Sequence, residues 1–198
     1  MIIVARSLAL LVSLLTAVLV YLLAIDELSL TSFNPAWRDI APVAVLQFVL
    51  VSGLLLSMTM LSKKTMYSYA KLAWPLKISS AVLLITVAVF CLVSLVVDRQ
   101  PLSSRGADYP SLATEITFLV LALAGVTGHK RIIRLILSCL VFLVSLGALL
   151  GYATATPLLF FSVPGASQGM SLVAALLFML SSSVVILMTV KWRYYSGG

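Results

Sequence analysis

Charged side chains are scarce in this 198-residue chain, and their scarcity excludes a soluble globular domain. Only 10% of the residues are charged and 62% are hydrophobic, with a mean hydropathy of +1.18, whereas a typical soluble domain carries about 25% charged residues. Most of this chain must therefore lie in a lipid bilayer, where the backbone can satisfy its hydrogen bonds only in helices or a closed barrel. The apolar runs are roughly 20 residues long, which favours helices.

Histidine and cysteine are nearly absent, and this excludes most chemistry that a membrane protein can perform. The chain has one histidine, His129, and two cysteines, Cys91 and Cys139. An intramembrane serine protease needs a paired Ser and His at depth, and zinc or copper sites need several His or Cys ligands close together. The expected depths of the two cysteines differ by roughly 10 Å, too far for a disulfide, so both are expected to be small apolar packing residues. We therefore expect no enzyme, no cofactor and no metal site.

Six apolar segments are present, and they predict an all-α integral membrane protein with a single transmembrane domain over residues 1–198. The segments cover residues 3–25, 41–61, 76–97, 111–128, 132–152 and 170–190. The fourth is the weakest, because Thr114, Glu115 and Thr117 dilute its first turns. The first segment could be a signal peptide, but Tyr21 and the following leucines stand where a cleavage site would lie, which favours an uncleaved helix.

Basic and acidic residues separate between alternate loops, and this predicts the orientation of the helices. Lysine and arginine near helix ends stay on the cytoplasmic side. With the N-terminus inside, ten of the thirteen basic residues are cytoplasmic: Arg6, Lys63, Lys64, Lys71, Lys77, Lys130, Arg131, Arg134, Lys191 and Arg193. All six acidic residues then lie outside: Asp26, Glu27, Asp39, Asp98, Asp108 and Glu115. We expect both termini in the cytoplasm, on the inner side of a plasma (inner) membrane.

The net charge of +7 does not indicate a nucleic-acid-binding protein. The basic residues are divided among short loops beside the membrane, and anionic lipid headgroups attract such residues. The lipid bilayer is therefore the expected partner of these charges, and no nucleic acid is expected.

The second, fourth and sixth segments begin alike, which indicates an internal repeat. Each has a small residue seven and four positions before a phenylalanine, and Leu or Ile two positions before it. The three phenylalanines are Phe48, Phe118 and Phe178, at offsets of 70 and 60 residues. The pattern predicts three tandem helical hairpins, each entering the membrane, turning outside and returning. Chance similarity among leucine-rich helices is the alternative.

Two of these hairpins combine a long apolar helix, a short external loop and a small-residue start before a run containing phenylalanine. They are represented by Leu149-Leu150-Gly151-Tyr152 through Pro157-Leu158-Leu159 to Ser171-Leu172 and Ala175-Leu176-Leu177-Phe178, and by Ile40-Ala41-Pro42 to Phe48-Val49-Leu50. The pattern resembles the multi-helix membrane input domain found before some bacterial sensor histidine kinases and diguanylate cyclases. Those proteins continue into cytoplasmic domains, whereas this chain stops at Gly198. The resemblance implies either an excised membrane domain or a relative that acts through a partner.

Polar residues near the outer ends of the helices are the first candidates for a ligand or signal site. Glu115 leads them, because an ionisable side chain inside a membrane helix is a functional hypothesis by default. The alternative is a carboxylate near water that the dipole of its own helix stabilises. Asp108, Tyr109 and Arg105 could complete an external polar site with it, or they could be solvated loop residues.

Apolar and small residues give two further candidates. The uncharged loop 154–168 contains Phe160 and Phe161, and it could cover a pocket for an apolar ligand or lie in the membrane interface. Gly147 and Gly151 make a small-xxx-small face on the fifth segment, which predicts close helix packing within the chain or across a homodimer.

Taken together, these features predict a non-catalytic sensory module that passes a signal to a cytoplasmic effector domain or partner protein through the sixth helix. A structural or accessory subunit of a larger membrane complex is one alternative. A small solute transporter or substrate-capture subunit is another, and it would need convergent polar groups near the membrane midplane. From sequence we expect only scattered serine and threonine there.

Overall fold

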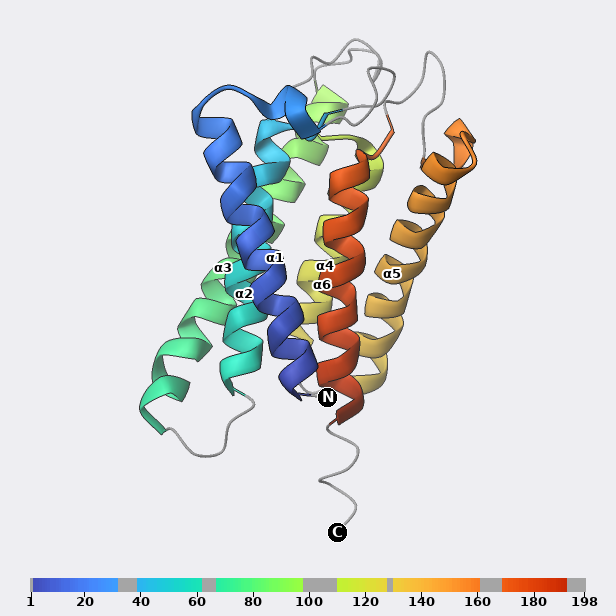
Figure 1. The fold of residues 1–198 in the computed structure, drawn as a ribbon. Helices are drawn as coiled ribbons and strands as arrows, with labels where there is room; N and C mark the ends of the chain where they lie inside the picture. The colour runs from blue at the N-terminus through green and yellow to red at the C-terminus, as the bar shows by residue number, and fades with distance from the viewer. Residues whose placement is uncertain are drawn as a thin grey trace.

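The computed structural model describes residues 2–31, 39–61, 67–97, 110–127, 130–160 and 169–191, and the regular secondary structure of this part of the chain is all helical, without strands. Its elements, in order, are α1 (Ile2–Ala24), η1 (Leu28–Thr31), α2 (Pro42–Leu61), α3 (Tyr67–Val97), α4 (Leu112–Val126), α5 (Arg131–Ala153), η2 (Pro157–Phe160) and α6 (Leu172–Lys191) (Figure 1). Five α-helices are long and apolar enough to cross a membrane. The exception is α4, which has 15 residues.

The helix bounds agree with the predicted segments to within two residues, except in α3. The prediction placed the start of this helix at residue 76, but it begins at Tyr67 and includes Pro75. Hydropathy detects only the part of a helix that is apolar enough for lipid, so it misses polar turns that continue beyond the membrane. The first turns of α3 contain such residues, among them Lys71.

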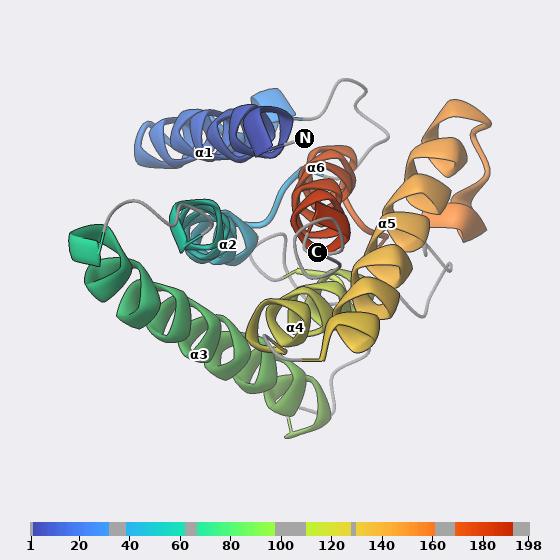
Figure 2. The same cartoon turned by 90° about the horizontal axis from the view of Figure 1, so that it is seen from below.

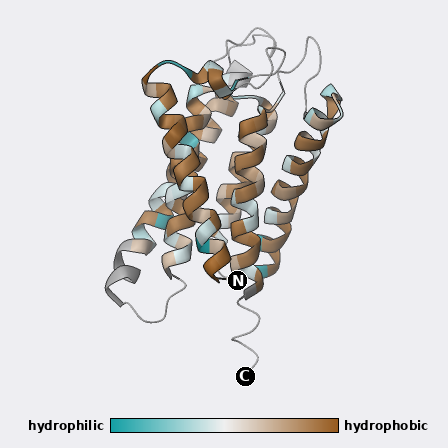
Figure 3. Ribbon diagram, viewed as in Figure 1, coloured by the Kyte–Doolittle hydropathy of each residue, from teal (hydrophilic) through white to brown (hydrophobic). Residues whose placement is uncertain are grey.

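The six helices form an inner set and an outer set. In the apolar stretches of α2 and α6, 61% and 56% of the residues are buried, against 22% in α1, 28% in α3 and 22% in α5. Figure 2 shows α2, α4 and α6 around the centre of the bundle, with α1, α3 and α5 at its edge. The outer helices bury one narrow stripe each, such as Ala5, Ala9, Val12, Thr16 and Leu19 of α1. Figure 3 shows α1 and α5 coloured mainly as hydrophobic, and large hydrophobic side chains are exposed on all three outer helices, among them Leu10, Phe90 and Leu143, as expected of helices that face lipid.

The outer helices are placed by the same rule in each hairpin. Helix α1 packs on α2 and α6, α3 packs on α4 and α2, and α5 packs on α6 and α4. Each outer helix thus contacts its own hairpin partner and the inner helix of one other hairpin. The hairpins α1–α2, α3–α4 and α5–α6 therefore follow one another around the bundle, as the sequence repeat predicts.

Two of the hairpins also turn in the same way. Asp26 and Ala155 each lie two residues beyond the end of an outer helix, and both have positive φ, 59° and 52°. A 3-10 turn then begins two residues later in both hairpins, as η1 and η2. A left-handed residue lets the chain leave the helix while the last carbonyl groups keep hydrogen-bond donors, as when Thr156 N–H donates to Gly151 O. The repeat therefore extends from the inner helices into the turns.

The bundle has two chemically different ends. At the hairpin end, where α1 leads to α2, α3 to α4 and α5 to α6, lie the acidic residues that the structure describes: Asp26, Glu27, Asp39 and Glu115. At the opposite end, here called the basic end, α1 begins and α6 finishes (Figure 1). Described basic residues gather toward that end: Arg6, Lys71, Lys77, Lys130, Arg131, Arg134 and Lys191. The charge separation read from the sequence is thus present in space.

Arginines at the basic end cap the C-termini of all three inner helices. Arg6 donates to Thr59 O near the end of α2, and Arg131 donates to Val190 O near the end of α6. Arg134 donates to Thr127 O, just beyond α4. A cation at a helix C-terminus satisfies free carbonyl groups and interacts favourably with the helix dipole. These arginines therefore stabilise the ends of the inner helices and also contribute to the positive charge of the basic end.

A glycine in α4 allows the inner helices to approach closely, which gives a testable expectation. A Cβ atom at Gly125 would lie 2.7 Å from Leu54 Cδ2 of α2, and Leu54 is fully buried. We expect Gly125→Ala to lower the free energy of unfolding, because overpacking costs about 1–3 kcal/mol and exceeds the gain of about 0.5–1 kcal/mol from alanine in a helix. Thermal unfolding in detergent measures the change.

The matched control is Gly147→Ala in α5, where an added Cβ would meet nothing within 4 Å. This variant should be as stable as the wild type or slightly more stable. Equal destabilisation by the two substitutions would contradict the close approach of α4 and α2. Among the described residues, Gly147 thus makes no close helix contact of the kind predicted within the chain, whereas Gly151 is buried. A homodimer contact at Gly147 stays a prediction.

Candidate functional site

The residues of the sequence repeat meet along the axis of the bundle, in layers that begin at the hairpin end. The first layer is a small opening where the three inner helices start. Its lining comes from all three hairpins: Asp39, Ala41 and Ala44; Pro110, Ser111 and Thr114; and Gly169, Ser171 and Ala174. The small residues seven and four positions before each phenylalanine are all in this lining.

Helix capping explains why the repeat has small residues at these spacings. Ser111 accepts a hydrogen bond from Thr114 N–H at the start of α4, and Ser171 accepts one from Ala174 N–H at the start of α6. Serine at this position satisfies an N–H group that has no partner within the helix. In α2 the first residue is Pro42, which has no N–H group to satisfy. Each inner helix therefore has at least one fewer unsatisfied N–H group where it begins at the opening.

The three repeat phenylalanines form one aromatic cluster deeper in the bundle. The ring centroids of Phe48 and Phe118 are 4.7 Å apart, those of Phe48 and Phe178 4.9 Å, and those of Phe118 and Phe178 4.6 Å. All three side chains are fully buried. Edge-to-face pairs at this separation are favourable arrangements of aromatic rings. This phenylalanine cluster confirms that the repeat is structural, and it fills the axis between α2, α4 and α6.

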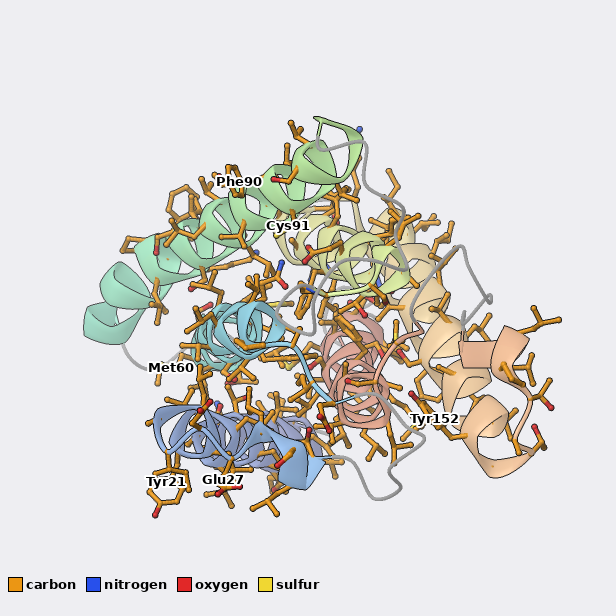
Figure 4. All side chains as sticks on the ribbon, turned by 90° about the horizontal axis from the view of Figure 1, so that it is seen from above. Tyr21, Glu27, Met60, Phe90, Cys91 and Tyr152 are labelled. Atoms are coloured by element: carbon orange, nitrogen blue, oxygen red, sulfur yellow. The ribbon has the colours of Figure 1, made fainter. Side chains whose placement is uncertain are left out.

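Between the opening and the phenylalanine cluster lies a polar centre made by Gln47 of α2, Cys91 of α3 and Glu115 of α4. Gln47 Nε2 donates to Glu115 Oε2 at 2.8 Å, and the Cys91 thiol lies close enough to the Glu115 carboxyl group to interact with it. Figure 4 shows Cys91 on the side of α3 that faces the bundle interior, whereas the neighbouring Phe90 points outward. Gln47 and Glu115 have no exposed surface, and Cys91 is 4% exposed.

Two polar atoms of this centre have no hydrogen-bond partner in the described part of the chain. They are Gln47 Oε1 and Glu115 Oε1, and both are buried. Buried polar atoms are nearly always hydrogen-bonded, so each exception needs an explanation. The centre therefore has two acceptor atoms for which its own side chains provide no donor.

The burial of Glu115 corrects the alternative that placed this carboxylate near water. Glu115 has no exposed surface, and Ser111 and Thr114 before it are also buried, whereas Leu112 and Ile116 on the other side of the same turns are exposed. Sequence reasoning also missed Gln47 and treated Cys91 as an apolar packing residue. One signal was available for Gln47, since it directly precedes the repeat phenylalanine Phe48 and carries the one amide side chain within α2.

The other predicted site residues are not brought to the polar centre. Asp108, Tyr109, Arg105 and Phe161 lie outside the described residues, and so does the side chain of Phe160. The loop that was expected to cover a pocket is described only as far as η2, where Leu158 is 68% exposed. Among the residues that the structure describes, no cluster of His, Cys, Asp or Glu side chains could hold a metal ion.

Searches for relatives were made against protein families, curated proteins and solved structures. None matches this chain. The resemblance to sensor input domains therefore stays a prediction that depends on the residues quoted for it. The function has to be argued from the opening, the polar centre and the phenylalanine cluster.

Proposed function

We propose that the chain is a non-catalytic input module in a bacterial inner membrane, with both termini in the cytoplasm and the hairpin end outside. The separation of acidic and basic residues between the two ends of the bundle supports this orientation. In it, the opening and the polar centre lie toward the outside, and α6 ends on the cytoplasmic side beside its capping residue Arg131.

The observation that carries the proposal is the position of α6. This helix begins at the opening, where Ser171 and Ala174 contribute to the lining, and it runs through the interior to the basic end. On the way it contacts α1, α2, α4 and α5. A change in the packing of any hairpin would therefore act on α6. In this proposal α6 passes that change to a cytoplasmic partner.

The phenylalanine cluster supplies a physical link between the polar centre and α6. Phe118 lies three residues after Glu115 on α4, close to one helical turn, and its ring packs against Phe178 of α6. A signalling domain needs two arrangements of a packed element that a signal can bias. Tightly packed rings suit that role, because a shift of α4 moves the Phe118 ring and so displaces the Phe178 ring that packs against it.

The same cluster distinguishes this proposal from a transporter. A transport path needs polar groups near the midplane and an interior that can open to both sides. Here the three rings fill the axis just below the polar centre. An accessory subunit of a larger complex is the remaining alternative, and the large apolar surface of α1, α3 and α5 is compatible with it.

The test is purification from native membranes in mild detergent, followed by mass spectrometry of the intact chain and its partners. We expect a histidine kinase or a diguanylate cyclase, either as a separate protein or as part of a longer polypeptide. Its activity in liposomes should change at least several-fold when the six-helix chain is included. A stoichiometric set of other membrane subunits, with no signalling enzyme among them, would overturn the proposal in favour of an accessory subunit.

A further inference from the structure

The Glu115 carboxyl group is in a setting that suits a neutral acid better than an ion. The carboxyl group is completely buried, and of its two oxygen atoms only Oε2 receives the amide N–H of Gln47. An ionised carboxylate offers about four acceptor sites and no donor. In a buried position an ion needs a counter-charge or a full set of hydrogen bonds. The polar centre provides one amide donor and one weak thiol donor.

The charged groups of the neighbouring helices do not supply that counter-charge. On α3, Lys77 lies 14 residues before Cys91, roughly 21 Å along the helix. On α5, Arg131 and Arg134 lie at the basic end, where their guanidinium groups cap helix C-termini. The described side chains of α2 and α6 include no titratable group.

The remaining titratable groups near α4 are neutral or acidic. On α5, Tyr152 donates its hydroxyl to Met170 O, and Cys139 is half-buried and lies nearer to the basic end. Asp39, just before α2, lines the opening and carries the same sign of charge as an ionised Glu115. Every described element packed against α4 therefore leaves Glu115 without a cationic partner.

A proton on Glu115 Oε1 would resolve both unsatisfied atoms of the polar centre. Protonation turns Oε1 from an acceptor without a partner into a donor. Gln47 Oε1 is a buried acceptor on the same amide group that already binds the carboxyl through Nε2. An acid and a primary amide can exchange two hydrogen bonds, one from N–H and one from O–H. One proton thus completes the hydrogen bonding that the side chains begin.

A metal or alkali cation fits the centre less well. Hard cations take about six or more oxygen ligands, whereas the polar centre has two unsatisfied oxygen atoms and a thiol. A proton needs only one acceptor at its new position. The two unsatisfied oxygen atoms are therefore enough to bind a proton and too few to coordinate a hard cation.

We propose that the polar centre is a proton-binding site in which Glu115 holds a proton at neutral pH, with Gln47 and Cys91 as positioning residues. The proton exchanges with water through the opening, where Ser111 and Thr114, joined by a hydroxyl hydrogen bond of 2.8 Å, lie directly before Glu115. Release of the proton leaves a carboxylate and requires water to enter the centre. This inference concerns the site itself and does not depend on the proposed signalling role.

Infrared spectroscopy of the full chain in lipid nanodiscs tests the inference. We expect the C=O stretching band of a protonated carboxyl group at neutral pH, which shifts in D2O and disappears in Glu115→Gln. The matched control is Glu27→Gln, at an exposed position near the hairpin end, and it should leave the band unchanged. Absence of the band from the wild type would overturn the inference. A band that disappears when potassium is replaced by sodium would also overturn it, in favour of a sodium site.

Chemical labelling keeps the test decisive if Glu115→Gln does not fold. A membrane-soluble carbodiimide reacts by addition with a protonated carboxylic acid, and peptide mapping of the wild type locates the adduct. We expect labelling at Glu115 that declines as the pH is raised, whereas a water-soluble carbodiimide with an added amine should label Asp26 and Glu27. Adducts from both reagents confined to Asp26 and Glu27 would contradict a protonated Glu115. Neither readout involves the effector, so this inference and the proposed function can fail separately.

Discussion

Phe118→Ala should cause the largest loss of stability among the single substitutions considered, because it removes one ring from a three-ring cluster. Phe118 is fully buried, and its ring centroid lies 4.7 Å from that of Phe48 and 4.6 Å from that of Phe178. Phe→Ala substitutions in packed interiors cost about 3–5 kcal/mol. For a chain of this size, 3 kcal/mol corresponds to a decrease of roughly 6–12 °C in Tm. Thermal unfolding in detergent, followed by circular dichroism, measures it.

Phe90→Ala is the matched control for this prediction. Phe90 is 67% exposed on the outward face of α3, where detergent or lipid can replace the ring contacts, so its Tm should change little. If Phe118→Ala and Phe90→Ala had the same small effect, the three rings would not form the tightly packed cluster described here.

The second large effect is expected at the hydrogen bond between Gln47 and Glu115, and it should appear as coupling between two substitutions. Gln47→Leu removes the amide donor and leaves a buried carboxyl group unsatisfied, and Glu115→Leu leaves the Gln47 amide unsatisfied. Each single substitution should cost about 1–3 kcal/mol, whereas replacing both partners by apolar groups can be nearly neutral. The double variant should therefore be more stable than the sum of the single effects predicts.

A double-mutant cycle measured by chemical or thermal unfolding gives this coupling energy. We expect about 1 kcal/mol or more, since residues that share a buried hydrogen bond couple by about 0.5–3 kcal/mol. The control cycle combines Gln47→Leu with Thr154→Val, because Thr154 is an exposed residue beyond α5 that hydrogen-bonds within its own turn. That pair should be additive. Additivity in both cycles would show that Gln47 and Glu115 have no coupling energy, and it would contradict a stabilising hydrogen bond between them.

Repetition in the chain was more informative than any single residue. Small residues four and seven positions before a phenylalanine could have been a coincidence among leucine-rich helices. The structure gives the spacing a cause, because these positions are the helix start and its first turn, and the phenylalanine lies two turns into the helix on the same inner face. Ser111 and Ser171 each cap one N–H group at the start of an inner helix, and Pro42 begins the third without an N–H group.

Other parts of the site were not predictable because they depend on contacts between segments. Glu115 follows the start of a helix, and local sequence alone suggests a carboxylate near water. Its burial depends on α2 and α3, which pack against α4 and place Gln47 and Cys91 beside the carboxyl group. Cys91 was read as a packing residue because nothing in its own helix indicates a polar partner. It lies beside Glu115 only because α3 packs against α4.

The sequence by itself determined that the chain is a helical membrane protein, where its helices lie, that its charges separate between two ends, and that its hairpins repeat. These properties depend on transfer of residues into lipid and on local helix geometry, so each segment carries them independently. Only the tertiary structure decided which helices are inside, that three phenylalanines meet, and that Gln47, Cys91 and Glu115 share one buried centre. Those outcomes depend on shape and hydrogen bonding between helices, because lipid is as apolar as leucine and hydropathy cannot rank one helix against another.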